Sequence, residues 1–245
     1  MACKFVKGVF IMSSKKIKLD ELFDKWEDKH LSEGHEDFIR DGIVDIEAWE
    51  HQTTPKVCFL LKEAYGDRFD LAEKLKNEGA FSETWFNGAI WAQAVYDAFM
   101  YPFGNVIPFN GDKLANIKKN AHSIIQCISV VNIKKSDGEC RSDNADLRNF
   151  AISDADELKE ELQIINPRII ICGNIWDIVK DTVFEGKAKE LAEIPEVYRW
   201  MDSFIISYYH PAYFTIKDEF HYYTIREICR GIRKNIEGSF YDGKL

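Results

Sequence analysis

The sequence predicts an α/β protein, a three-layer α/β/α sandwich with a short, mostly parallel central sheet. Four continuous apolar runs, each typical of a strand buried on both faces, alternate with segments of helical periodicity. The runs span residues 56–61, 128–131, 167–172 and 204–207. Because strands separated by helices are joined by right-handed crossovers, we expect helices on both faces of the sheet.

Helical spacing of apolar residues predicts the elements between these strands. Leu19, Leu22 and Trp26 recur on one side of segment 18–30, and acidic residues fill the other side. A short helix with a connector is expected over 35–52. Further helices are predicted at 69–78, 84–100, 112–126, 154–165, 174–182 and 222–236.

Composition limits the class of protein. The chain has 245 residues, 46% of them hydrophobic, which is enough to bury the core of one elaborated domain. The net charge of −9 argues against coating nucleic acid by bulk electrostatics, although it leaves room for a small basic groove. We expect a flexible leader at 1–13 and a single domain at 14–245.

Cysteine usage and hydropathy bear on location and partners. The six cysteines are scattered without a C-x-x-C pair, which predicts a reduced, cytoplasmic protein. No apolar run approaches the length of a membrane span, so no membrane association is expected. The absence of an H-E-x-x-H motif or a clustered Cys/His set leads us to expect no metal. We expect a monomer.

Polar residues follow each apolar run. Glu63, Tyr65 and Asp67 come after the first run, and Asn132 follows the second. Gly173-Asn174 follows the third, and Tyr208-Tyr209-His210-Pro211 follows the fourth. Because open α/β sheets bind ligands outside the carboxyl ends of their strands, these side chains predict a site at one edge of the sheet.

Over residues 40–235, the order and placement of these motifs resemble the uracil-DNA glycosylase superfamily. Lys62-Glu63-Ala64-Tyr65-Gly66 resembles the site motif G-E-A-P-G of one branch. Asn132 matches the asparagine that reads the pyrimidine edge, and His210-Pro211-Ala212 keeps the first two residues of the motif H-P-S. Phe86 resembles the aromatic residue that stacks on the flipped base.

The resemblance implies a uracil-DNA glycosylase-like fold and a DNA-repair hydrolase that cleaves the N-glycosidic bond of uracil or a related base, without a cofactor. His210 would stabilise the charge on the departing base. Glu63 or Asp67 would position water or offset the positive sugar. Asn132 offers a donor and an acceptor on one amide, and Phe86 would stack on an extruded base.

The resemblance also implies contacts around the base. Ala64 and Tyr65 would line the base pocket, where the bulk of Tyr65, at the motif's proline position, could narrow it. Tyr213 and Phe214 would enter the duplex as an apolar wedge, although they could equally pack on the last helix. A phosphate-binding strip is predicted from the basic residues of the last helix and those after Asn132, although a solvated helix face is an equal alternative: Arg226, Arg230, Arg233, Lys234, Lys134 and Lys135.

The chain departs from the family motifs at several positions. A second branch, with the motif G-Q-D-P-Y, has an aspartate where this chain has Ala64. The G-E-A-P-G branch commonly carries an iron–sulfur cluster on four cysteines, and this chain lacks the required spacing, so no cluster is expected. Ala212 replaces the serine that contacts a phosphate.

Alternative interpretations remain open. His210 could belong to an ordinary turn, and Asn132 could cap the following segment. The pocket could bind a nucleotide, a modified base or a single strand without cleaving it, because a fold does not establish an activity. It could also hydrolyse another modified base or a nucleoside. Four further histidines are predicted in loops or at the surface, His30, His35, His51 and His122, while His221 has no identifiable partner.

Overall fold

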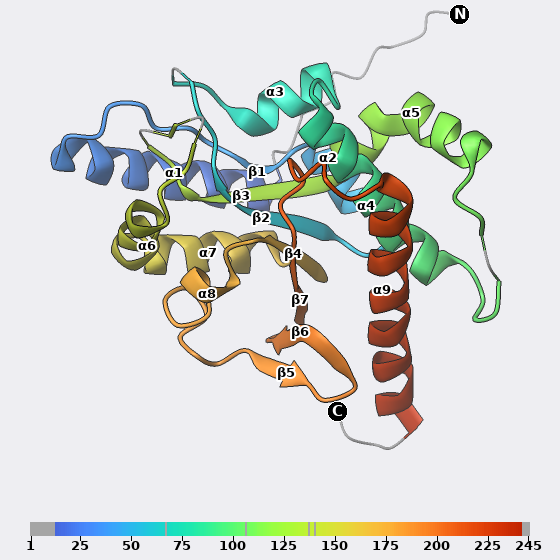
Figure 1. The fold of residues 1–245 in the computed structure, drawn as a ribbon. Coiled ribbons are helices and arrows are strands. Elements are labelled where there is room, and N and C mark those ends of the chain that lie inside the picture. Colours follow the sequence, from blue (N-terminus) through green and yellow to red (C-terminus); the bar gives the residue numbers. More distant parts are fainter. Residues whose placement is uncertain (1–12, 67, 106, 137, 140, 242–245) are drawn as a thin grey trace, which may run out of the picture.

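A computed structural model describes residues 13–66, 68–105, 107–136, 138–139 and 141–241, of which 238–241 are described by their backbone (Figure 1). Residues 1–12 of the predicted leader lie outside the described residues. Ser13 precedes the first helix as its N-cap, and its side chain accepts a hydrogen bond from the backbone N–H of Lys15.

A seven-stranded sheet forms the centre of the molecule, in the order β1-β3-β2-β4-β7-β6-β5. The four inner strands, β3, β2, β4 and β7, run parallel and correspond to the four apolar runs of the sequence. The strands outside them pair antiparallel. The bounds are β1 (Gly42–Ile43), β2 (Val57–Glu63), β3 (Ile128–Lys134), β4 (Ile169–Gly173), β5 (Lys189–Leu191), β6 (Ile194–Trp200) and β7 (Ser203–Tyr208).

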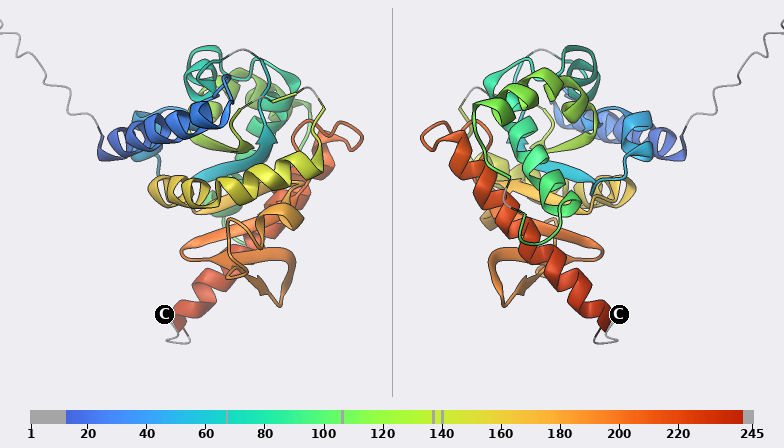
Figure 2. Two further views of the ribbon diagram at one scale, coloured as in Figure 1. Left: turned by 90° about the vertical axis from the view of Figure 1, so that its left-hand side faces the viewer. Right: turned by 90° about the vertical axis from the view of Figure 1, so that its right-hand side faces the viewer.

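Helices cover both faces of this sheet, which confirms the α/β class. Their bounds are α1 (Ser14–Glu33), α2 (Ile46–His51), α3 (Leu71–Glu78), α4 (Glu83–Met100), α5 (Gly111–Gln126), α6 (Asn144–Ser153), α7 (Ala155–Ile165), α8 (Trp176–Val179) and α9 (Asp218–Tyr241). In Figure 2 the left view looks onto the side of α1, α6 and α7, and the right view onto the side of α4, α5 and α9.

Alternation along the inner strands creates two separate cores. Phe59 of β2 points to the core formed with α3, α4, α5 and α9. The next residue, Leu60, points to the core formed with α1, α7 and α8. Both side chains are fully buried, as expected for parallel strands covered by helices on both faces.

Several elements differ from the sequence-based predictions. Helix α8 spans only four residues, whereas 174–182 was predicted. The edge strand β1, the hairpin β5–β6 and helix α6 were not predicted. β1 pairs with β3, which is distant in sequence, and β6 pairs antiparallel with β7, the next strand in the chain, at the edge of the sheet.

The chain topology defines one crevice. After β2 the chain passes through α3, α4 and α5 to reach β3, and after β3 it passes through α6 and α7 on the opposite face to reach β4. Strand β4 then pairs with the other edge of β2. The carboxyl ends of β2 and β4 therefore flank a topological switch point, where open α/β sheets bind their ligands.

Candidate functional site

A pocket of about 870 Å³ lies at these strand ends. It is lined by Glu63, Asn132, Asn174 and His210, from four successive parallel strands or the residues that follow them. Its volume falls within the range of small-molecule sites. The structure thus brings together the polar residues that the sequence places at strand ends. Asp67, also expected here, lies outside the described residues.

His210 lines this pocket with a neutral imidazole. Its Nδ1 accepts the backbone N–H of Ala212 at 3.1 Å, so the proton of the neutral ring resides on Nε2. Burial, together with the positive charge of Lys62, lowers the pKa of His210 to about 4. The imidazole is therefore neutral at pH 7 and can donate from Nε2 without carrying a charge.

The loop that carries His210 is anchored from helix α4. The Nδ2 of Asn87 donates to the carbonyl of Pro211 at 2.8 Å, in the interior. Within the loop, the N–H of Tyr213 donates to the carbonyl of His210 at 2.9 Å. Sequence reasoning missed Asn87, although a polar residue within an otherwise apolar helix is a recognisable signal of such a role.

Asn132 lies within β3 and does not cap a following helix. Its backbone N–H and its amide Nδ2 both donate to Oδ2 of Asp41, at 2.7 and 3.0 Å. Among the described residues, the amide oxygen of Asn132 makes no hydrogen bond, and Asn132 lines the pocket. This oxygen is available as an acceptor for a ligand. Asp41 was not predicted as a site residue.

Glu63 ends β2 with a carboxylate that is only partly satisfied. The side chain is 4% exposed, and its Oε2 lies 3.7 Å from Nζ of Lys134. Oε2 also accepts a long bond from the N–H of Glu139 at 3.4 Å. Oε1 is buried without a hydrogen-bond partner among the described residues. Glu63 lines the pocket, and its unpartnered carboxylate oxygen can accept a hydrogen bond from a water or ligand that reaches it.

Gly138 allows a second loop to approach the end of β2. A Cβ at this position would lie 1.8 Å from the carbonyl oxygen of Ala64, which no side chain can tolerate. This loop contributes Glu139, Arg141 and Ser142 to the pocket lining. Ala64, predicted as a contact residue, lines the pocket, and its carbonyl oxygen lies close to Gly138.

Aromatic rings surround the pocket mouth. Tyr65 is 64% exposed and lies at the rim, so its bulk leaves the pocket open. Tyr213 stacks on Tyr209 with ring centroids 4.8 Å apart, and Phe214 is 53% exposed. Both Tyr213 and Phe214 line the pocket and are available to stack on a ligand.

The predicted stacking residue Phe86 lies elsewhere. It is partly buried against the core, and Nζ of Lys118 lies 5.5 Å from its ring centroid. Phe86 is not among the described residues that line the pocket, whereas its neighbour Trp85 and Phe81 are. One residue of offset on a helix turns a side chain by about 100°, which explains why the motif alone could not select the ring.

Lys135 has to be removed from the predicted phosphate-binding strip, while the other residues of the strip stay a prediction. Lys135 is fully buried, with Nζ 2.5 Å from Oδ1 of Asp41 and 2.8 Å from Oε2 of Glu161, so it cannot reach a phosphate on the surface. Lys134 is also buried and forms an ion pair with Asp146. Arg230 lies 3.2 Å from Glu227. These cations neutralise carboxylates of the protein.

Two histidine predictions were wrong. His30 is buried, with Nε2 2.8 Å from Oδ2 of Asp154 and Nδ1 2.5 Å from Oγ of Ser136. This network joins α1 to the start of the loop over the pocket. His221 is also buried, and its Nδ1 lies 3.0 Å from the hydroxyl of Tyr208.

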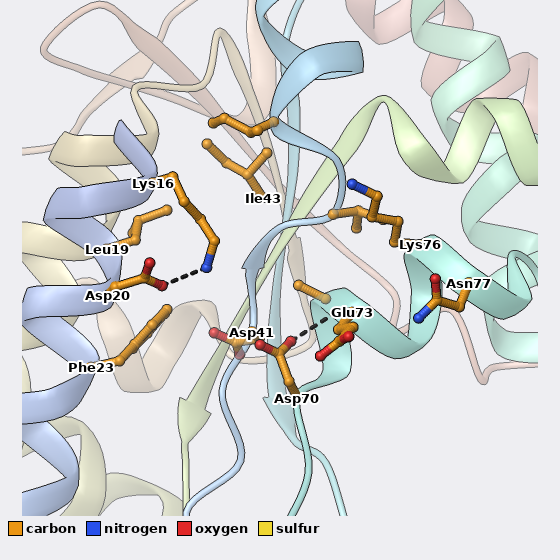
Figure 3. Close-up of a pocket in the computed structure, with 13 residues that line it drawn as sticks. Lys16, Leu19, Asp20, Phe23, Asp41, Ile43, Asp70, Glu73, Lys76 and Asn77 are labelled. Atoms are coloured by element: carbon orange, nitrogen blue, oxygen red, sulfur yellow. Dashed lines mark hydrogen bonds and ion pairs between the residues drawn. The ribbon is translucent and has the colours of Figure 1, made fainter. Parts of the chain in front are cut away.

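A second pocket, of about 420 Å³, lies between α1, β1 and α3 (Figure 3). Its charged groups are engaged in ordinary structural contacts. Lys16 pairs with Asp20 at 2.5 Å, and Asp70 caps α3 by accepting the N–H of Glu73 at 2.8 Å. Asp41 is held by Lys135. The strand-end pocket is therefore the better candidate for chemistry.

No known family model and no curated protein sequence matches this chain. Within the described ranges, no group of three or more His, Cys, Asp or Glu residues is arranged to hold a metal ion. None of the described helices is both long enough and apolar enough to cross a membrane.

Proposed function

We propose that the strand-end pocket holds a uracil-like base and that the protein hydrolyses its N-glycosidic bond, as the resemblance to the uracil-DNA glycosylase superfamily implies. The observation that carries the proposal is the state of His210, a residue that lines the pocket with a neutral imidazole whose proton lies on Nε2. A neutral donor of this kind suits a leaving base that becomes an anion.

The chemistry divides among three residues. The bond between C1′ of the sugar and the base nitrogen breaks, and its electron pair leaves with the base, whose oxygen receives the hydrogen bond from Nε2 of His210. Water adds to C1′, and Oε1 of Glu63 accepts the proton that water loses. The amide oxygen of Asn132 accepts a ring N–H of the base. Protonation of the departing base by solvent completes the reaction.

The architecture supports the finer proposal of a uracil-DNA glycosylase-like fold. The three motifs of the resemblance lie at the carboxyl ends of β2, β3 and β7, and all of them reach one pocket. A pocket of about 870 Å³ can accommodate a nucleotide unit. Tyr65 stands at the rim and does not occupy this space.

A second candidate function follows from the pairing of the predicted phosphate-binding residues with carboxylates of the protein. Lys134, Lys135 and Arg230 each pair with a carboxylate, so these three residues offer a duplex little free positive charge. The exposed rings of Tyr65 and Phe214 instead provide stacking faces for a single strand or a free nucleotide. Binding without cleavage, or hydrolysis of a nucleoside, would use the same pocket.

A substrate series tests the proposal. Wild-type protein would be incubated with a uracil-containing oligonucleotide, single-stranded and double-stranded, and with deoxyuridine, and the released base would be quantified by chromatography. Release from an oligonucleotide is expected, with the single strand preferred. Release from deoxyuridine alone, with little dependence on salt, would favour the nucleoside hydrolase. Tight binding without release would favour the binding protein.

A further inference from the structure

Asp41 takes the place of a missing strand partner beside β3. The edge strand β1 pairs with β3 through only two residues, Gly42 and Ile43. The backbone N–H of Asn132 lies beyond this pairing, and Oδ2 of Asp41 accepts it at 2.7 Å. Asp41 thereby satisfies a buried donor that would otherwise lack a partner.

The same carboxylate oxygen fixes the orientation of the Asn132 amide. Nδ2 of Asn132 donates to Oδ2 of Asp41 at 3.0 Å. A carboxylate only accepts hydrogen bonds, so the nitrogen side of the amide must face Asp41. Rotating the amide by half a turn would set two acceptors against each other in the interior and lose the bond. The amide oxygen of Asn132 is consequently left for the pocket that it lines.

A buried cation keeps Asp41 available for this task. Nζ of Lys135 lies 2.5 Å from Oδ1 of Asp41 and 2.8 Å from Oε2 of Glu161, and all three side chains are fully buried. Burial raises the pKa of Glu161 well above its ordinary value, which favours its neutral form. The positive charge of Lys135 then balances the carboxylate of Asp41. Figure 3 shows Asp41 beside Asp70, at the base of the second pocket.

We infer that Asp41 is a positioning residue: it holds the amide of Asn132 in one orientation and thereby determines which base the pocket selects. This orientation favours a base with a ring N–H, as in uracil, over a base with an unprotonated ring nitrogen, as in cytosine. Cytosine in the same pose would set a lone pair against the amide oxygen of Asn132. This inference rests on the proposed function, because it takes Asn132 to be the residue that reads the base.

The test compares Asp41→Asn with Glu161→Gln. In Asp41→Asn a single acceptor oxygen must serve both Lys135 and Asn132, so the amide of Asn132 is no longer forced into one orientation. Glu161 contacts both Lys135 and Asp41, and Glu161→Gln alters the same buried cluster while leaving both carboxylate oxygens of Asp41 in place, so it serves as the matched control. Binding would be measured with two single-stranded oligonucleotides, containing 2′-fluoro-2′-deoxyuridine or 2′-fluoro-2′-deoxycytidine, because the fluorine suppresses cleavage.

We expect wild type and Glu161→Gln to bind the uracil oligonucleotide at least about tenfold more tightly than the cytosine one, and Asp41→Asn to lose most of this ratio. A merely structural role would weaken both complexes together and leave the ratio unchanged. An unchanged ratio in folded Asp41→Asn would overturn the inference.

A second readout concerns the unliganded protein and does not depend on base binding. In a nitrogen-edited NMR spectrum of wild type and of Glu161→Gln, one Nδ2 proton of Asn132 should be shifted downfield and protected from exchange with water. If Asp41→Asn fails to fold, the protection of the Asn132 amide protons in the wild-type spectrum still tests whether Asp41 holds this amide. Wild-type protein that binds neither oligonucleotide would contradict the base site, whereas an Asn132 amide that exchanges freely would overturn the role of Asp41 itself.

Discussion

The backbone N–H of Ala212 donates to Nδ1 of His210 at 3.1 Å, which assigns the proton of the neutral imidazole to Nε2. The turn formed by His210 and Ala212 therefore makes His210 a neutral side chain whose Nε2–H can donate a hydrogen bond. Because the backbone of Ala212 makes this contact, the contact does not depend on the side chain at position 212. The turn is held in place by Asn87 of α4.

The first prediction concerns the ionisation of His210. Burial and Lys62 lower its pKa to about 4, so a reaction or complex that needs the neutral ring should not respond to this group between pH 6 and 8. Activity should decline as the pH approaches 4. NMR titration of the imidazole nitrogens checks this, with Nε2 protonated at pH 7. An Nδ1-protonated ring, or a pKa close to 6.5, would contradict the assignment.

The same shift predicts how stability depends on pH. The pKa of His210 is depressed in the folded protein, so below pH 6.5 the unfolded chain binds a proton that the folded chain does not. The resulting stability is present above pH 6.5 and is lost as the pH falls from 6.5 towards 4. Between pH 7 and pH 5, wild type should lose on the order of 2 kcal/mol of unfolding free energy beyond the loss of His210→Asn. Equal losses in urea denaturation of the two proteins would count against burial of the ring.

The third prediction concerns Glu63. Glu63→Gln removes the proton acceptor from the buried Oε1 position while preserving its shape, and should reduce base release by about 10²–10⁴-fold. Glu139→Gln is the control, because Glu139 is an exposed carboxylate that lines the same pocket. Single-turnover rates would be compared for both. Equal rate losses in the two variants would show that Glu63 contributes only negative charge to the pocket and does not act as the proton acceptor.

The fourth prediction concerns the loop over the pocket. Gly138→Ala would place a methyl group 1.8 Å from the carbonyl oxygen of Ala64, so the loop must move away from β2. We expect a loss of about 1–3 kcal/mol in unfolding free energy, as for other overpacked sites, together with weaker ligand binding. Gly111→Ala, which meets no atom within 4 Å, should change stability by at most about 0.5 kcal/mol. Thermal denaturation and ligand titration of both variants measure the two effects.

The inner strands and most of the pocket could be predicted from the sequence because their signals are local. Continuous apolar runs identify β2, β3, β4 and β7, and the residues after them reach one crevice in any parallel sheet. The edge elements give no such signal. Strand β5 reads Lys189-Glu190-Leu191 and is stabilised by pairing with β6, which the local pattern does not encode.

The errors at Lys135 and His30 share one physical cause. Both residues are polar and read as surface positions, but their partners lie far away in the sequence: Asp41 and Glu161 for Lys135, and Asp154 for His30. A buried charge is tolerated only when the fold supplies its partner. The sequence does not show which residues will be in contact, so it does not identify the lysine that will form a buried ion pair.

The experiment to do first is base release from a single-stranded uracil oligonucleotide by wild type, His210→Leu and Glu139→Gln, under single-turnover conditions at pH 7.5. We expect release by wild type and Glu139→Gln, and a fall of about 10²–10³-fold in His210→Leu, because leucine has no donor and the loss is typical of removing one donor from a developing anion. Undiminished release by His210→Leu, or no release by wild type at high protein concentration, would contradict the role of His210.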